Sequence, residues 1–243
     1  MGLLSRIFAG GRSADRGPAP LGAVRNRVTC TRYSVKGKNP ATGRRKTVQV
    51  VSESTDPLDV VQKKSGLLPP YEVEVVQPQG PSEAQLQYAS RLGFTFPPDA
   101  TSKDATVFLT RAEDGVPLTQ PAAPDWMVRY VISKGIFVPA YAGAGEVSAA
   151  YLFGSSERER AAFFCLRVFC TVHRQGYRVL EDATPEEAAL FYGFADAYAD
   201  DGEFSRSLEH YGAADLPLDR AAPLKRIKAF DLAAAYLKVK AGA

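Results

Sequence analysis

The sequence of 243 residues has few of the side chains that most often carry catalysis or bind metals. It holds three cysteines, two histidines, one tryptophan and two methionines. Three cysteines do not form the paired framework of a disulfide-stabilised secreted protein. No apolar run reaches the roughly 18 residues of a membrane-spanning helix, and the first residues lack the order of a signal peptide. We therefore expect a soluble, cytoplasmic protein without integral membrane association.

The two histidines offer little to an enzyme. A Ser-His-Asp or Cys-His arrangement would have to use His173 or His210, and neither lies in a recognisable catalytic motif. Cys170 and His173 could form half of a zinc site, but no second pair has the required spacing. Gly143-Ala144-Gly145 lacks the further residues of a phosphate-binding loop and is interpreted as a turn. We expect no catalytic set, cofactor or metal ion; a hydrolase or transferase that uses His173 or His210 remains an alternative.

Charge is distributed unevenly along the chain. The formal net charge is +3, but residues 1–50 hold eleven Lys or Arg and one acid, Asp15, which gives +10. The remaining residues hold nineteen bases and twenty-six acids, which gives −7. Within them, residues 181–219 carry eleven acids and a single base, Arg206. A basic front and an acidic body can act on different partners although their charges cancel in the total.

Residues 1–24 are predicted to be a flexible basic leader, because residues 10–22 are rich in Gly, Pro, Ala and Arg. Residues 1–9 could form a short amphipathic helix that is too short to be stable alone. It could dock on a membrane surface or a partner, or be a free terminus.

Residues 25–77 have the alternating pattern of a small β-rich unit. β-branched and aromatic residues alternate over residues 28–35 and 47–51, and residues 36–46 contain Asn-Pro and Gly turn signals, which predicts a hairpin. A helix with Pro57 at its first position follows, and residues 71–76 alternate again. The pattern predicts a ββαβ unit.

The predicted hairpin carries the densest cluster of cations in the chain. Its tip holds Lys36, Lys38, Arg44, Arg45 and Lys46, and Arg32 and Tyr33 lie on the adjoining strand. Such cations can neutralise phosphates, Arg32 could add a phosphate contact, and Tyr33 could stack on a base. The other interpretation is a solvated turn that binds nothing.

A helix, an extended loop and a second helix are predicted for residues 81–111. Ser82 with Gln85, and Thr101 with Asp104, have the pattern of N-terminal caps, and Gly93 ends the first helix. The apolar residues expected to face inward are Leu86, Ala89 and Leu92 in the first helix, and Val107 with Phe108 or Leu109 in the second.

Over residues 82–111, about an eighth of the chain, this segment resembles the SAP family of DNA-associated helix-extended-helix motifs. The resemblance lies in Leu86, Gly93-Phe94, Thr101-Ser102-Lys103-Asp104, Leu109 and Arg111. The resemblance implies that Lys103 and Arg111 contact the DNA backbone from the second helix. The connecting loop is longer here, with Pro97-Pro98, and acids offset the few bases. A structural or protein-binding hairpin is the alternative. The rest of the chain resembles uncharacterised bacterial proteins.

After a Pro- and Gly-containing linker at residues 112–124, residues 125–243 are predicted to be an α-helical domain. Helices are expected near residues 125–134, 156–174, 184–198, 203–211 and 222–240, with a loop at 139–145 and aromatic side chains in a bundle core. The predicted fold class is α+β: a ββαβ unit, a helix-extended-helix hairpin and a C-terminal all-α bundle.

Two functional hypotheses follow from the charge distribution. The first is a non-enzymatic nucleic-acid-associated protein, with DNA favoured, that contacts the phosphate backbone through the basic hairpin and the SAP-like hairpin. The second is a protein-interaction adaptor or inhibitor, of the kind carried by bacterial mobile elements. Its acidic helical domain would meet a basic partner through Asp200, Asp201 and Glu203.

Overall fold

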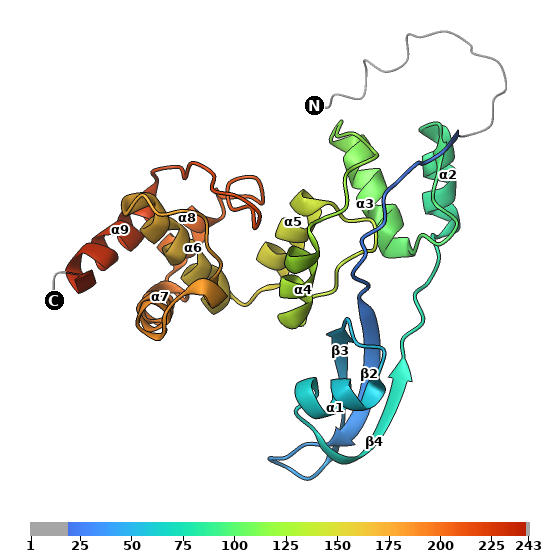
Figure 1. The fold of residues 1–243 in the computed structure, drawn as a ribbon, viewed down its shortest axis with the longest axis horizontal. Helices are drawn as coiled ribbons and strands as arrows, with labels where there is room; N and C mark the ends of the chain where they lie inside the picture. The colour runs from blue at the N-terminus through green and yellow to red at the C-terminus, as the bar shows by residue number, and fades with distance from the viewer. Residues whose placement is uncertain (1–18, 242–243) are drawn as a thin grey trace, which may run out of the picture. The chain divides into compact units, whose positions relative to one another are not determined.

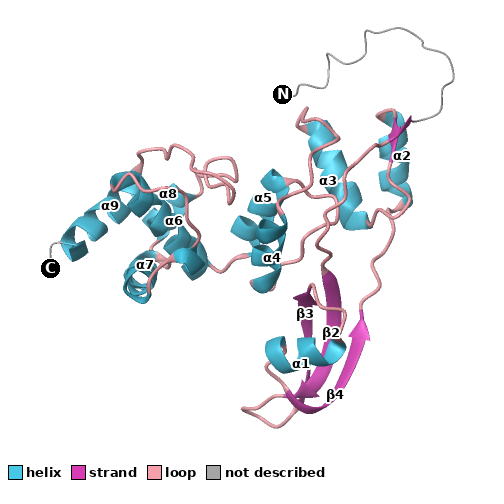
Figure 2. Cartoon of the chain, in the orientation of Figure 1, coloured by secondary structure: helices cyan, strands magenta, loops and turns pink. Residues whose placement is uncertain are grey.

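The computed structural model describes residues 19–241, so most of the leader predicted for residues 1–24, including the short helix over residues 1–9, lies outside the described residues. The chain divides into two compact units. Unit 1 comprises Gln79–Thr119 with the N-terminal segment up to Ala23, and unit 2 comprises Val24–Pro78 and Gln120–Ala243. The α+β fold class is confirmed, because a small antiparallel sheet is followed by many helices (Figures 1 and 2).

The ββαβ arrangement predicted for the start of unit 2 is present. Strands β2 (Thr31–Lys38) and β3 (Arg45–Ser52) form an antiparallel hairpin, and β4 (Leu68–Val75) pairs with the other edge of β2. Helix α1 (Pro57–Lys64) packs on one face, where Tyr33, Val35, Val50, Val60, Val61 and Leu67 form a small core. Successive strand residues point to opposite faces, so every second residue of β2 lies on the face away from α1.

A glycine allows β4 to pass close to β2. The β2–β4 register is irregular between Lys36 and Lys38, around Gly37. A Cβ atom at Gly37 would lie 2.9 Å from the Cβ of Leu67 and 2.9 Å from the carbonyl oxygen of Leu68. Carbon and oxygen atoms do not approach this closely, so a side chain here would displace β4.

Unit 1 is built on the two predicted helices. Helices α2 (Glu83–Arg91) and α3 (Ser102–Glu113) both begin with capping boxes, at Ser82 and at Thr101, as the sequence predicts. Between them β5 (Phe94–Thr95) pairs in parallel with β1 (Ala19–Pro20). The rings of Phe94, Phe96 and Phe108 pack with centroid distances of 5.6 and 6.1 Å.

The inward face predicted for α2 is wrong at two of its three positions. Leu86 and Leu92 are each 45% exposed, and Ala89 is the buried residue of the helix. The loop after α2 supplies Phe94 and Phe96 to the core instead, so larger α2 side chains are not required there. In α3 the prediction holds for Phe108, which is fully buried.

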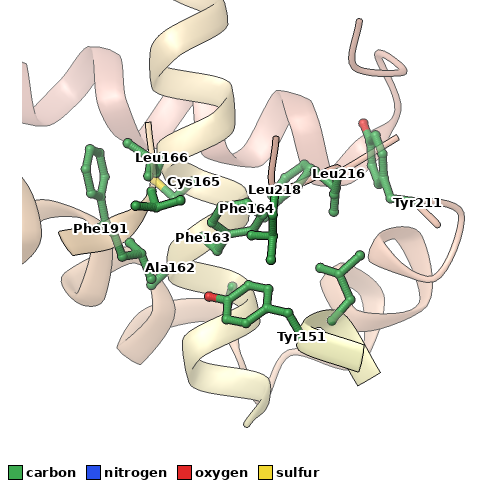
Figure 3. Close-up of a cluster of buried hydrophobic side chains, with 14 of the residues drawn as sticks. Tyr151, Ala162, Phe163, Phe164, Cys165, Leu166, Phe191, Tyr211, Leu216 and Leu218 are labelled. Atoms are coloured by element: carbon green, nitrogen blue, oxygen red, sulfur yellow. The ribbon is translucent and has the colours of Figure 1, made fainter. Parts of the chain in front are cut away.

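The rest of unit 2 is a helical bundle. It contains α4 (Asp125–Ser133), α5 (Ala144–Gly154), α6 (Glu157–Val172), α7 (Pro185–Tyr198), α8 (Gly202–Leu208) and α9 (Lys228–Ala241), with a short 3-10 helix at Leu180–Asp182. Helix α6 is central: Ala162, Phe163, Phe164, Cys165 and Leu166 are fully buried, and Figure 3 shows them among Tyr151, Phe191, Leu216 and Leu218.

Two parts of the helical prediction are corrected. Gly143-Ala144-Gly145 is not a simple turn: Gly143 precedes α5, and its amide donates a hydrogen bond to the Glu146 carboxylate at 2.9 Å. The sequence pattern does not predict the start of α5, because two glycines lie there and glycine is a poor helix former. The last helix begins at Lys228 rather than near residue 222, because Lys225 is engaged outside a helix: its carbonyl accepts from the Tyr211 hydroxyl and its ammonium pairs with Asp215.

The sheet and the helical bundle of unit 2 are joined by a buried side chain. The Nδ2 atom of Asn26 donates to the carbonyl of Ala142 at 2.9 Å, and its Oδ1 accepts from the amide of Ala123, also at 2.9 Å. The amide of Asn26 donates to the carbonyl of Ala140 at 2.8 Å. An exposed ion pair between Arg129 and Glu53 adds a second connection.

Candidate nucleic-acid interface

The loop between β2 and β3 is held by one asparagine. The amide of Asn39 donates to the carbonyl of Arg44 at 2.9 Å, and the amide of Gly43 donates to the carbonyl of Asn39 at 2.8 Å. The Asn39 side chain accepts from the amide of Ala41 at 2.9 Å. Gly43 has a φ of +66°, a conformation that side chains disfavour. These bonds give the loop a defined shape.

Five cations surround this loop, and we call them the basic tip: Lys36, Lys38, Arg44, Arg45 and Lys46. All five side chains are exposed. Lys36 and Lys38 lie on the face of β2 away from α1, and Arg45 pairs with Lys38 and shares that face. Lys46 pairs with Gly37 and lies on the α1 face, while Arg44 ends the loop. The basic tip therefore presents positive charge on both faces of the hairpin.

One acid lies among these cations. The Glu72 carboxylate is 3.5 Å from the Lys36 ammonium and 3.1 Å from the Arg45 guanidinium. The other three cations, Lys38, Arg44 and Lys46, form no ion pair with any residue in 19–241. Because exposed ion pairs stabilise a fold by only about 0–1 kcal/mol, Glu72 leaves Lys36 and Arg45 available to a competing anion.

Arg32 and Tyr33 both make contacts within the fold; Tyr33 is buried and Arg32 is half-buried. Tyr33 is 1% exposed, and its hydroxyl donates to the carbonyl of Ser54 at 2.5 Å. Burial raises the pKa of this hydroxyl. The guanidinium of Arg32 lies 4.7 Å from the centre of the Phe137 ring. In this position the Tyr33 ring has no exposed face on which a base could stack.

The two cations predicted to contact DNA from the second helix of the hairpin have different environments. Lys103 is exposed in the first turn of α3. Arg111 is 3% exposed, its Nη1 donates to the carbonyl of Leu118 at 2.8 Å, and its guanidinium lies over the Phe108 ring. Arg111 therefore holds the segment after α3 against the helix, and its guanidinium is not exposed. The spacing Ala105, Phe108, Arg111 on one helix face is the sequence signal for this burial.

The acids predicted to meet a partner are partly engaged within the fold. Asp201 caps α8, with its carboxylate accepting from the amides of Glu203 at 2.9 Å and Phe204 at 2.8 Å. Glu203 is 3.2 Å from the ammonium of Lys228, and Asp200 is exposed. Two of the three predicted residues thus have a structural partner.

The acid excess of residues 181–219 is offset by bases from outside that segment. Glu181 pairs with Lys134 at 2.7 Å, Glu187 with Arg178 at 2.5 Å, and Asp196 with Arg158 at 2.5 Å. Asp215 pairs with Lys225 at 3.0 Å. The hydrogen bond from Arg178 lowers the pKa of Glu187 to about 2. The local charge in space is therefore less negative than the sequence suggests.

The two histidines are exposed, whereas the two cysteines of α6 are buried. His173 is exposed at the end of α6, with its ring 4.4 Å from that of Phe169, and His210 is exposed after α8. Cys165 and Cys170 are buried, and burial raises the pKa of both thiols. Within residues 19–241, no group of three or more His, Cys, Asp or Glu is placed to hold a metal ion. None of the helices in that range has the length and apolar character to cross a membrane.

No protein-family model, curated protein or solved structure matches the chain.

Proposed function

We propose that the protein binds nucleic acid through the phosphate backbone, without catalysing a reaction on it, and that the basic tip is the main contact. One observation supports this most directly: five exposed cations surround a hydrogen-bonded loop, and a single acid, Glu72, pairs with two of them. The phosphates of a nucleic acid are anions repeated along its backbone, and a fixed cluster of lysines and arginines is the complementary surface.

The number of cations sets the expected strength of binding. Each neutralised phosphate on duplex DNA contributes about −0.9 to the slope of log affinity against log salt concentration. Five contacts would give a slope of about −4.5, and competition from Glu72 makes about −3 to −4 more realistic. Affinity should then be on the order of 1–100 μM near physiological salt, the range typical of non-specific binding.

The shape of the tip, like its charge, supports binding. The bonds made by Asn39 fix the loop before a ligand arrives. A preformed loop loses less conformational entropy on binding than a flexible one. Lys103 extends the proposal to unit 1, where its exposed ammonium in the first turn of α3 is a further candidate for a phosphate contact.

A salt titration with a matched pair of charge-reversal variants tests the proposal. Binding of a fluorescent 24-base-pair DNA would be followed by anisotropy between about 25 and 200 mM salt, a range in which counterion release dominates. The test variant carries Lys38→Glu, Arg44→Glu and Lys46→Glu. The control carries the same charge change at exposed residues far along the chain: Arg220→Glu, Lys238→Glu and Lys240→Glu.

The two variants separate local contact from net charge. The test variant should lose at least ten-fold in affinity at the lowest salt and show a shallower slope, while the control should stay within about three-fold of the original protein. Equal losses in both variants, or no binding by the unaltered protein at about 25 mM salt, would refute the proposal. Far-ultraviolet circular dichroism on each variant checks that the fold is retained.

A further inference from the structure

The basic tip has positive charge but no exposed aromatic ring. Between residues 31 and 76 the sequence has two aromatic residues, Tyr33 and Tyr71. Tyr33 is buried under α1, and Tyr71 is half-buried with its hydroxyl donating to the carbonyl of Leu67 at 2.9 Å. Proteins that bind single strands use exposed aromatic rings on which successive bases stack. The tip offers no such platform.

The third strand limits how far the hairpin can enter a groove. A two-stranded ribbon fits the major groove of B-form DNA, which is about 12 Å wide. Here β4 stays beside β2 up to the pairing of Leu68 with Lys38, so three strands reach almost to the loop. Three strands at about 4.8 Å spacing, with side chains outside them, exceed that width. The base edges are then out of reach of the strands, and the phosphates are not.

We infer that the ligand of the basic tip is a double-stranded nucleic acid, contacted along its phosphate backbone and bound without regard to base sequence. This inference rests on the proposed function. A duplex holds its phosphates at fixed positions and at a higher charge density than a flexible single strand, so each neutralised phosphate releases more counterion. A loop fixed by Asn39, bearing cations on both faces, gains most from such a rigid array.

The shared chemistry of DNA and RNA duplexes is the paired phosphate backbone, so the test has a separate arm for each. Anisotropy at about 50 mM salt, where backbone contacts dominate, would compare two unrelated DNA duplexes of equal length, an RNA duplex, and the single strands of each. The protein is used as the full chain. The Lys38→Glu, Arg44→Glu, Lys46→Glu variant is measured on every ligand.

The expected result is at least ten-fold tighter binding of the duplexes than of their single strands, with the two DNA sequences within three-fold of each other. The variant should lose duplex binding. Single strands bound as tightly as duplexes, or a ten-fold difference between the two DNA sequences, would overturn the inference while leaving the proposed function intact. Unchanged binding by the variant would instead count against the proposed function itself. The RNA duplex distinguishes the two kinds of nucleic acid. Equal affinity for the DNA and RNA duplexes indicates that the tip recognises paired phosphates alone, and tighter binding of the DNA duplex indicates a preference for B-form geometry.

Discussion

The carboxylate of Glu72 lies 3.1 Å from the guanidinium of Arg45, although the two residues belong to opposite edge strands of the sheet. Their side chains meet across β2, on the face turned away from α1. An anion that approaches Arg45 therefore has to compete with a carboxylate already in place.

Replacing Glu72 should strengthen binding. Glu72→Gln removes the competing charge and is expected to raise duplex affinity about two- to five-fold at low salt, which matches the energy of an exposed ion pair. Glu74→Gln is the matched control, since Glu74 lies on the same strand and the same face as Glu72 and pairs with Ser34. Anisotropy titrations of both variants measure the difference. Equal gains for the two would show that net charge, not the local pair, sets affinity.

The close approach at Gly37 makes a stability prediction. Gly37→Ala places a Cβ atom 2.9 Å from Leu67 and Leu68, so β4 must shift and the free energy of unfolding should fall by about 1–3 kcal/mol. Gly212→Ala is the control in the same unit, because its added methyl group meets no atom within 4 Å. Urea unfolding followed by circular dichroism gives both values. A Gly37 variant as stable as the control would mean that β4 adjusts without cost.

Arg111 and Lys103 should respond in opposite ways. Arg111→Ala leaves the carbonyl of Leu118 without the donor it has now, and should lower stability by about 1–3 kcal/mol. Lys103→Ala should leave stability within about 0.5 kcal/mol, as expected for an exposed site, and reduce duplex affinity modestly. Thermal unfolding and anisotropy are measured on both. An affinity loss in the folded Arg111 variant that exceeds the loss at Lys103 would contradict this assignment.

The pair between Glu187 and Arg178 predicts a pH dependence. The pKa of Glu187 is lowered from 4.5 to about 2, so the folded state binds its proton less readily than the unfolded state does. The stabilisation is present above about pH 4.5 and is lost as the pH falls toward about 2. Glu187→Gln should therefore flatten the decline of unfolding free energy across that window, measured by urea unfolding at several pH values. For Glu209→Gln, a control at an exposed glutamate where Glu187 is half-buried, the unfolding free energy should decline as steeply as in the original protein.

Local signals in the sequence predicted most of the elements. The caps at Ser82 and Thr101 each precede a helix, and the alternation from residue 28 onward marks the hairpin. These features depend on residues that are neighbours along the chain. Helix α5 has no such signal, because Gly143 offers no side-chain oxygen and Gly145 disfavours the helical conformation.

The proposed interface could be predicted only in part. The tip cations are exposed as expected, since they belong to a turn and its flanking residues. The sequence pattern does indicate the burial of Tyr33, because Tyr33 shares a strand face with Val35. The pairing of Glu181 with Lys134 cannot be predicted from the sequence, since 47 positions separate them and composition does not reveal which distant base meets which acid.

The amide side chain of Asn26 has a consequence for how unit 2 comes apart. It bonds to the Ala123 amide on one side and to the Ala142 carbonyl on the other, and these groups are buried. Separating the segment before β2 from the loops that precede α4 and α5 breaks both hydrogen bonds, and each such bond contributes about 0.5–1.5 kcal/mol to stability. The sheet and the bundle are therefore coupled in unfolding.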